Sequence, residues 1–378
     1  MEYRRLGRTN LQVSLLGVGG GYVSLLEVEE GTRVYERAWD LGLNYFDGRY
    51  GSSSTMIKPV IKRGRSRCIV VTKTQEATYD GAMRRIDEDL AELDTDYLDI
   101  FYLRTYNHDM RRAHFAPGGS VEALLKAREE GKIHFLGLAG HSDLTALAQG
   151  VETDLIDVVI FPLNIVRREG LQQLVPVCQE HDVGMVIMKP VDAGSTPPEV
   201  ALPWLANQPI HTMVPGISTM EHLEADYRAL NRASMPLTAE EEAEVERWRQ
   251  KLEHRSCHIC DRVCQVVCEA GIPIDHLLYH DVFYNEYKAL GLERLLELPL
   301  AGWVKGSMER AFARRLKLIR SCTHCGKCEA VCPYGLPIMQ MLDDMMDEHL
   351  AVLEAVRERG WTERYADAPS PYSGGRGS

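Results

Sequence analysis

The stretch Cys322-Thr-His-Cys325-Gly-Lys-Cys328-Glu-Ala-Val-Cys332-Pro333 decides how the C-terminal third of the chain folds. Its spacing, C-x2-C-x2-C-x3-C-P, is one by which neighbouring thiolates bind iron–sulfur clusters. A second run lies upstream and reads Cys257-His-Ile-Cys260-Asp-Arg-Val-Cys264-Gln-Val-Val-Cys268. Eight of the ten cysteines fall in these two runs, which favours clusters over a zinc site or a disulfide framework.

The two runs resemble each other beyond their cysteines, because Glu-Ala-Gly-Ile-Pro-Ile follows Cys268 and Pro-Tyr-Gly-Leu-Pro-Ile follows Cys332. This repeat predicts a duplicated cluster-binding half, and hence two 4Fe–4S clusters. In two-cluster ferredoxins the fourth cysteine of a run binds the other cluster. The two sets of ligands would then be Cys257, Cys260, Cys264 and Cys332, and Cys322, Cys325, Cys328 and Cys268. The upstream run departs from the pattern in its spacing and in having Glu269 in place of the proline, so its cluster would have the less regular geometry.

Composition bounds the class of protein. The chain has 378 residues, 45% of them apolar, which is enough for about two domains with full cores. Its net charge of −12, without a basic tract, argues against nucleic acid and anionic membrane as partners. The chain has no apolar run long enough for a membrane helix, and its charged N-terminus does not read as a signal peptide. We therefore expect a cytoplasmic protein in which Cys68 and Cys178 are buried thiols.

Between residues 11 and 235, short apolar runs alternate with amphipathic segments. The runs that predict strands are 13–17, 44–47, 68–72, 98–103, 133–139, 158–161, 184–188 and 213–215. The segments that predict helices include 28–41, 79–93, 121–130 and 170–181. Eight evenly spaced strands, each followed by a helix, favour a (β/α)8 TIM barrel over a doubly wound open sheet.

The chain after the barrel predicts helices. We expect the barrel in residues 1–236 and a connecting helix in 237–253, which begins with the capping box Thr238-Ala-Glu-Glu241. Residues 254–360 predict a mainly helical, ferredoxin-like two-cluster domain, with helices at 274–290, 292–297, 308–319 and 338–359. The tail, 361–378, is expected to be disordered, because the stretch from Pro369 is poor in apolar residues.

Polar residues at the ends of three predicted strands form the candidate active site. Asp47 ends the second strand and is followed by Tyr50, Lys73 ends the third, and Arg104 ends the fourth. Catalysis on a parallel barrel takes place at this end of the strands. A tyrosine beside a lysine that is paired with an aspartate can act as a general acid, because the cation lowers the pKa of the phenol. On these residues alone, solvated side chains at the barrel rim are the simpler interpretation.

Several motifs resemble the aldo/keto reductases over residues 1 to about 230. They are the opening Tyr-Arg-Arg-Leu-Gly-Arg-Thr-Asn-Leu-Gln-Val-Ser, Asn-Tyr-Phe-Asp47 with Tyr50-Gly51, Thr72-Lys73, Asp96-Tyr-Leu-Asp99, Gly137-Leu-Ala-Gly-His141-Ser142 and Pro215-Gly216-Ile-Ser218. The whole chain resembles the subgroup that carries a C-terminal helical ferredoxin domain. The resemblance implies that Asp47, Tyr50 and Lys73 fill three places of the family's Asp-Tyr-Lys-His tetrad.

The resemblance also implies a nicotinamide coenzyme, NADP or NAD. Its contacts would include Ser142, Asn164, Gly216 and Ser218. Gly19 lies in a glycine-rich stretch after the first predicted strand, where it would leave space for a ligand at the barrel mouth. That stretch is not the dinucleotide fingerprint, because Tyr22 stands where a glycine is required. The segment 219–226 offers no clear cation for the 2′-phosphate of NADP.

The chain also departs from the family at the active site. Arg104 stands at the histidine position, and a guanidinium is suited to hold a carboxylate or to stabilise an oxyanion. His108 and His114 lie in the following loop and could replace the histidine, although solvated loop side chains are the simpler expectation. An anionic substrate is thereby favoured over ordinary aldehydes.

Three functions follow from the sequence. The first is an oxidoreductase that reduces a small, anionic carbonyl or unsaturated molecule in a barrel coupled to two clusters, with a ferredoxin-like or other redox partner. The second is an electron-transfer subunit whose barrel has lost carbonyl reduction. The third is a conventional reductase in which the clusters are structural. The sequence leaves open whether a nicotinamide binds.

Overall fold

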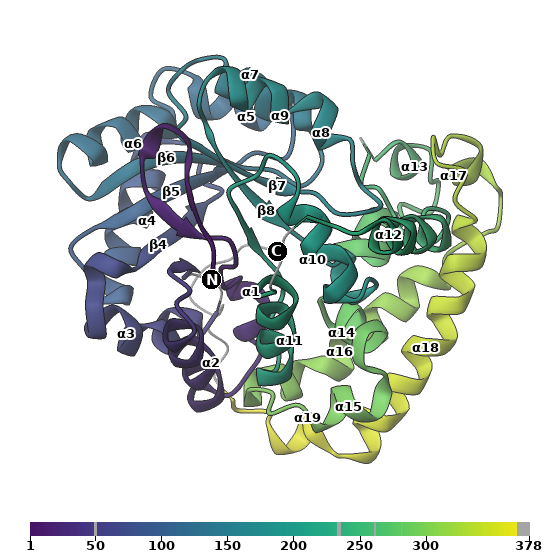
Figure 1. The fold of residues 1–378 in the computed structure, drawn as a ribbon. Helices are drawn as coiled ribbons and strands as arrows, with labels where there is room; N and C mark the ends of the chain where they lie inside the picture. The colour runs from purple at the N-terminus through teal and green to yellow at the C-terminus, as the bar shows by residue number, and fades with distance from the viewer. Residues whose placement is uncertain (49–50, 233–235, 261, 281, 369–378) are drawn as a thin grey trace.

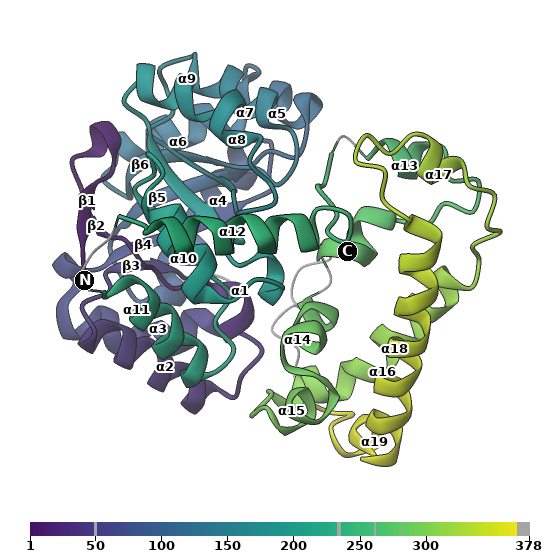
Figure 2. The same ribbon diagram turned by 45° about the vertical axis from the view of Figure 1, so that its right-hand side comes forward.

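The computed structural model describes residues 1–48, 51–232, 236–260, 262–280 and 282–368. Figure 1 shows a curled sheet surrounded by helices, and Figure 2 shows a second group of helices packed at one side of it. None of the helices in these ranges is both long and apolar enough to cross a membrane. Of the tail predicted as disordered at 361–378, residues 369–378 lie outside the described residues; Trp361–Arg364 form a short helix with Trp361 buried, so the expectation was wrong for that part.

Seven parallel strands, arranged in chain order, form one sheet in the described part of the chain. They are β3 (Tyr45–Asp47), β4 (Ile69–Thr74), β5 (Leu98–Arg104), β6 (Ile133–Ala139), β7 (Val158–Pro162), β8 (Gly184–Met188) and β9 (Thr212–Val214). Apolar side chains that point into the curled sheet form a core of their own, with Tyr45 and Tyr102 joined through their hydroxyls at 2.8 Å. The predicted order and type of these seven strands are confirmed.

The segment predicted as the first strand, 13–17, behaves differently. Its first part belongs to β2 (Gln12–Ser14), which pairs antiparallel with β1 (Tyr3–Arg5) outside the barrel. The residues that follow close the sheet through single bridges, in which Leu16 pairs with Met213 of β9 and Val18 with Phe46 of β3. The prediction of one continuous parallel strand at 13–17 was therefore wrong. An apolar run in the sequence does not show that its first residues pair with Tyr3–Arg5 in an antiparallel hairpin.

A ring of helices covers the outer face of the sheet. These helices are α2 (Val28–Asp40), α3 (Ser53–Gly64), α4 (Tyr79–Leu93), α5 (His108–Phe115), α6 (Ser120–Glu129), α7 (Leu144–Val151), α8 (Gly170–Gln173), α9 (Val175–Glu180), α10 (Pro198–Ala206) and α11 (Met220–Leu230). The short helix α1 (Gly20–Val23) instead contributes Tyr22 to the wall of the cavity that contains Asp47 and Lys73. The apolar stripe of α4 predicted its limits, which are set by the Thr78 side-chain cap and by left-handed Asp94. The helix predicted at 170–181 is two short helices instead, with Pro176 opening the second.

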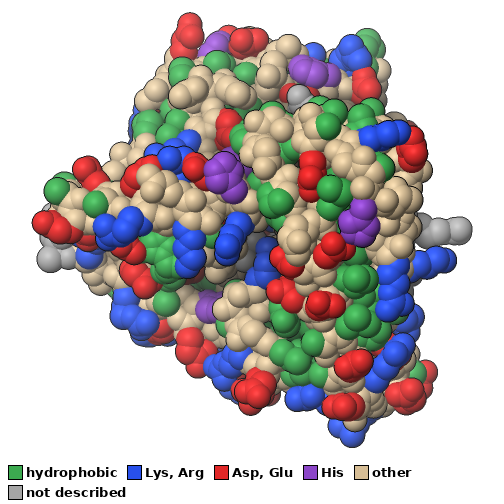
Figure 3. All heavy atoms as spheres, turned by 90° about the vertical axis from the view of Figure 1, so that its right-hand side faces the viewer, with side chains coloured by type: hydrophobic (Ala, Val, Ile, Leu, Met, Phe, Trp, Pro, Cys, Tyr) green, Lys and Arg blue, Asp and Glu red, His purple; other side chains and the backbone are tan. Residues whose placement is uncertain are grey.

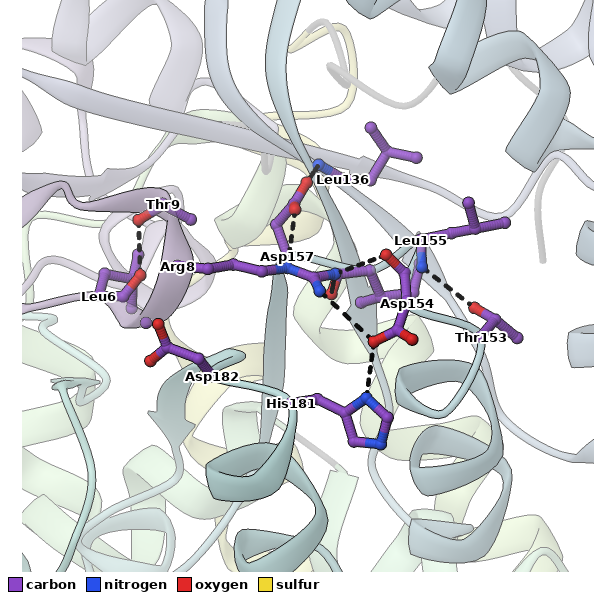
Figure 4. Close-up of polar contacts among 12 residues, drawn as sticks. Leu6, Arg8, Thr9, Leu136, Thr153, Asp154, Leu155, Asp157, His181 and Asp182 are labelled. Carbon is purple, nitrogen blue, oxygen red and sulfur yellow. Dashed lines mark hydrogen bonds and ion pairs between the residues drawn. The ribbon is translucent and has the colours of Figure 1, made fainter.

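The N-terminal residues close the bottom of the barrel, away from the candidate site. Leu6 is fully buried in the barrel interior. Arg8 pairs with Asp157 at 3.2 Å and donates to the carbonyl of Asp154, whose carboxylate contacts His181 at 2.7 Å (Figure 4). This network stabilises the end of the barrel that catalysis does not use.

Helices make up the C-terminal region. They are α12 (Ala239–Leu252), α13 (Val263–Val266), α14 (Val282–Leu290), α15 (Leu292–Glu297), α16 (Gly302–Ile319), α17 (Lys327–Ala330), α18 (Ile338–Glu358) and α19 (Trp361–Arg364). The capping box at Thr238 is present, as predicted. The helix predicted at 274–290 is interrupted, because a π-turn, η4 (His276–His280), precedes α14, and α16 begins six residues before its predicted start.

Candidate functional site

A buried ion pair forms the centre of the candidate active site. Lys73 Nζ lies 2.7 Å from Asp47 Oδ2, and only 6% and 5% of the two side chains are exposed. Parallel pairing of β3 with β4 brings the ends of these strands together at one edge of the sheet. The structure therefore unites two of the four predicted catalytic residues. Tyr50 lies outside the described residues, and the other oxygen of Asp47, Oδ1, has no hydrogen-bond partner among the described ones.

Arg104, the fourth predicted residue, lines the same cavity from the end of β5. Its position is fixed by His114, whose Nε2 lies 3.0 Å from the Arg104 carbonyl while Nδ1 lies 2.6 Å from Ser120 Oγ. Because a carbonyl only accepts, Nε2 carries the hydrogen in this arrangement. Burial lowers the pKa of His114, which favours the neutral ring. The expectation of a solvated loop histidine was wrong here: His114 is fully buried and acts through the backbone of Arg104.

The cavity has a volume of about 510 Å³ and extends from the ion pair across the ends of β8 and β9 to α11, α12 and α14. Sequence reasoning missed Lys189, a half-buried residue in its wall. Lys189 follows β8 with a left-handed backbone, φ 55°, and Asp192 follows with φ 46°. Asn164 holds this loop, because its Nδ2 donates to the carbonyl of Lys189 at 3.2 Å and to Asp192 at 3.4 Å. A strained backbone that neighbouring residues enforce is typical of functional sites.

Lys189 also connects the cavity to the C-terminal region. Its ammonium lies 4.4 Å from the ring centre of Tyr279, and the Arg167 guanidinium lies 4.9 Å from the same ring. Burial, and after it the charge of Arg167, lowers the pKa of Lys189 to about 7. The only sequence signal for this residue was a lysine directly after a predicted strand, the same signal that singled out Lys73.

The predicted coenzyme contacts lie in different surroundings. Gly19 and Gly216 line the cavity. Ser142 donates to the carbonyl of Tyr106 at 3.3 Å and is not among the cavity-lining residues. Asn164 is fully buried, and Ser218 Oγ is 2.6 Å from Glu286 Oε2 in α14.

Internal hydrogen bonds engage the groups that a nicotinamide coenzyme would need. Besides its two donated bonds, Asn164 accepts the backbone N–H groups of Val166 and Arg167 at 3.0 and 2.8 Å. The amide of Asn164 is thus satisfied by the protein. Of the predicted coenzyme contacts, Asn164 and Ser218 are therefore engaged by hydrogen bonds within the protein, whereas Gly19 and Gly216 line the cavity.

The cysteines form two groups that follow the crossover pattern. Cys268, Cys322, Cys325 and Cys328 line one small hollow together. In the other group, burial, and after it the charges of neighbours that include Cys260 and Cys332, raise the pKa of Cys264 to about 11, as expected for thiols that lie close together.

Each group brings together thiols of the type that iron–sulfur clusters require. Among the described residues no three His, Cys, Asp or Glu converge closely enough to share one metal ion. A 4Fe–4S cluster does not need such convergence, because each thiolate binds a different iron. Glu269, which replaces a proline of the motif, forms an ion pair with Lys327 of the other run and so ties the two halves together. Cys68 and Cys178 lie outside both groups and are buried, as predicted.

The upstream cysteine group contacts the barrel. The ring of His258 stacks on Tyr334 with centres 3.7 Å apart, and both side chains hydrogen-bond to Glu169, at 2.9 and 2.8 Å. Burial opposes ionisation of Glu169, but these hydrogen bonds lower its pKa to about 2. Ser256, next to Cys257, donates to Asp192 at 2.6 Å. One of the two cysteine groups is therefore anchored to the loop that carries Lys189.

Comparisons with known proteins match the two parts of the chain separately. Residues 16–197 match the aldo/keto reductase family, and residues 256–336 match the 4Fe–4S dicluster domain. L-galactose dehydrogenase of Arabidopsis thaliana is 27% identical over 216 residues, which are 51% of this chain and 66% of that protein. Pyridoxal 4-dehydrogenase of Microbacterium luteolum is 23% identical over 245 residues, which are 51% of this chain and 71% of that protein. The chain thus spans about two thirds of the length of these relatives.

Solved structures agree on the fold of the barrel. The holo form of aldo-keto reductase AKR11C1 from Bacillus halodurans superposes with a TM-score of 0.56 and 22% identity, over 66% of this chain and 96% of that one. The solved structure supports the barrel fold, and the family match assigns residues 16–197 to the aldo/keto reductases. The chain combines an aldo/keto reductase domain at its N-terminus with a 4Fe–4S dicluster domain at its C-terminus.

Proposed function

We propose that the protein reduces the carbonyl group, or an activated double bond, of a small anionic molecule, with electrons from two 4Fe–4S clusters. One observation carries the proposal. The wall of the cavity that holds the Lys73–Asp47 pair is shared with the cluster domain, because Glu286 and Ala289 line it, and Lys189 in the same wall contacts the ring of Tyr279. Tyr279 in turn lies close enough to Cys257 for the charge of that thiolate to raise the tyrosine pKa.

The charges in the cavity favour an anionic substrate. Lys73 is paired with Asp47, and Arg104 and Lys189 line the same cavity from the ends of β5 and β8. A guanidinium can bind a carboxylate through two parallel hydrogen bonds, so Arg104 is assigned to the anionic group of the substrate. Lys189 would contribute a second positive charge while it is protonated. The proposed substrate class is therefore carbonyl compounds that carry a carboxylate.

Tyr50, assisted by Lys73, is assigned as the proton donor. The Lys73 ammonium is held by Asp47, and a lysine cation lowers the pKa of a phenol placed beside it. A donor of this kind protonates the carbonyl oxygen as negative charge develops on it. Because His114 is engaged with Ser120 and with the Arg104 backbone, we assign it to positioning of Arg104 rather than to proton transfer.

Each bound cluster would carry one electron, so two clusters together can supply the pair that carbonyl reduction requires. The ligands of the first would be Cys257, Cys260, Cys264 and Cys332, and those of the second Cys268, Cys322, Cys325 and Cys328. Cys325 is exposed at the surface, whereas Cys257 is buried next to the barrel. We assign the second group to electron entry from a ferredoxin-like or other redox partner. Figure 3 shows acidic and basic side chains interspersed on one face of the molecule.

One observation favours a second function. Arg104 replaces the histidine of the family, which is expected in an electron-transfer subunit whose barrel no longer reduces carbonyls. The two functions differ in whether the barrel residues matter to turnover. In the subunit, Tyr50→Phe would leave electron transfer through the protein intact.

The test uses anaerobically purified, cluster-loaded protein and a chemically reduced one-electron dye. Oxidation of the dye is followed in the presence of 2-oxo acids and, as matched controls, the corresponding neutral methyl esters. We expect turnover with one or more acids and at least tenfold lower kcat/KM with the ester. Equal use of acids and esters would refute the anionic substrate class, and failure with every carbonyl and unsaturated compound would favour the electron-transfer subunit.

A further inference from the structure

The cluster domain covers the part of the cavity where the barrel was expected to hold its coenzyme. Helix α14 packs on the turn η3 (Asp192–Gly194), so that a Cβ added at Gly194 would lie 2.6 Å from the Cβ of Ala289. From the same helix, Glu286 accepts a hydrogen bond from Ser218 at 2.6 Å. Only 4% of Glu286 is exposed, so this contact is made inside the protein.

Tyr22 fills the space beside Gly216, which is another predicted coenzyme contact. A Cβ added at Gly216 would lie 2.5 Å from Cδ2 of the Tyr22 ring. Asn285 of α14 donates to the Tyr22 hydroxyl at 3.4 Å, and burial followed by the charge of Glu286 raises the pKa of Tyr22. The absence of a side chain at Gly216 thus makes room for a residue of this chain, which α14 holds in place.

This end of the cavity offers a phosphate no lysine or arginine among the described lining residues, and burial favours the neutral form of its carboxyl groups. Asp226 and Glu286 line it, and burial raises the pKa of Asp226 well above its ordinary value and that of Glu286 to about 7. His222, whose Nδ1 lies 3.1 Å from Ser218 Oγ, also has a pKa lowered by burial. The lysine and arginine residues among the described cavity-lining residues, Lys73, Arg104 and Lys189, belong to the strand ends instead. A pyrophosphate would therefore be desolvated there without a cation to compensate its charge.

We propose that α14 together with Tyr22 excludes nicotinamide dinucleotides from the barrel, so that the cavity takes the substrate alone. This inference rests on the proposed function and specifies its reductant. A carbonyl becomes an alcohol by accepting two electrons and two protons, and a dinucleotide would deliver both electrons with one hydride. Without it, the two electrons come singly from a ferredoxin- or flavodoxin-type donor. Both protons come from solvent, the one on oxygen through Tyr50.

The test measures binding of NADPH and NADH to the anaerobic, cluster-loaded protein by nicotinamide fluorescence. We expect no saturable binding of either up to about 1 mM, the upper end of ordinary enzyme affinities. The double variant Tyr22→Ala/Glu286→Ala enlarges this end of the cavity. It should bind NADPH or NADH at least tenfold more tightly than the wild type. The control is Glu293→Ala, which removes an exposed carboxylate from the neighbouring helix α15 and should leave binding unchanged.

Saturable binding by the wild type at micromolar concentration would overturn the inference. So would a double variant that binds no better than the wild type, because α14 and Tyr22 would then not be the obstacle. The proposed function fails on a different result, namely the absence of any turnover with the dye as donor. If the protein turns over with the dye and also binds NADPH, the proposed reductase function stands and only the exclusion of dinucleotides is rejected.

Discussion

The buried ion pair gives the sharpest prediction about the barrel. Lys73→Met removes the positive charge but keeps most of the side-chain volume, and it leaves Asp47, of which 5% is exposed, without its cation. Loss of one partner from a buried pair costs about 3–5 kcal/mol of stability, since an uncompensated charge remains inside. Replacing both partners, as in Asp47→Leu/Lys73→Met, removes that charge. We expect the double variant to be more stable than the single variant by at least about 2 kcal/mol.

The assay is anaerobic guanidinium unfolding of the cluster-loaded variants, followed by circular dichroism and by tryptophan fluorescence. The matched control is Lys62→Met, because Lys62 forms a 3.1 Å pair with Asp94 in which 66% and 63% of the side chains are exposed. That change should alter stability by less than about 1 kcal/mol. The reasoning is refuted if Lys73→Met is as mild as Lys62→Met, or if the double variant is no more stable than Lys73→Met.

The remaining predictions concern catalysis and the clusters. Tyr50→Phe should lower kcat by about 10²–10⁴-fold, as expected for loss of a general acid, while the cluster spectra stay unchanged; undiminished turnover would remove Tyr50 from the mechanism. Because the ammonium of Lys189 is lost as pH rises through its pKa of about 7, KM for an anionic substrate should rise above that pH. Lys189→Arg, which stays charged, should abolish this rise, and equal pH profiles would contradict the assignment. Cys268→Ala and Cys325→Ala should each remove the same electron paramagnetic resonance signal, and Cys332→Ala the other; loss of one common signal in all three would refute the crossover.

Much of the barrel could be predicted because its strands are short apolar runs between helical segments. The strands at 133–139 and 184–188 have the predicted limits, since apolar residues there end at polar or turn-forming ones. The prediction of the first strand failed because a strand that pairs antiparallel with Tyr3–Arg5 has the same kind of residues as a barrel strand. Sequence periodicity carries no information about which neighbour an apolar run will pair with.

Site residues could be predicted from the sequence where they lie directly at the end of a predicted strand. They could not be predicted where the fold brings distant segments together. Asp47 and Lys73 follow from the ends of neighbouring strands. The contact between Ser218 and Glu286 joins residues 68 positions apart, so no local pattern announces it. Likewise, the left-handed backbone of Lys189 depends on Asn164 from another loop. Spacing and repetition predicted two cysteine runs that act together, and the grouping across the runs was an expectation taken from two-cluster ferredoxins.

The central claim, that the barrel cavity draws electrons from the cluster domain, can be tested in a single turnover. Cluster-loaded protein is reduced, freed of excess reductant, and mixed anaerobically with a carbonyl acid that it turns over. We expect the visible absorbance of the oxidised clusters to return as about one hydroxy acid forms for each pair of reduced clusters. Lys73→Met should slow this return. Clusters that stay reduced while product forms would contradict the claim.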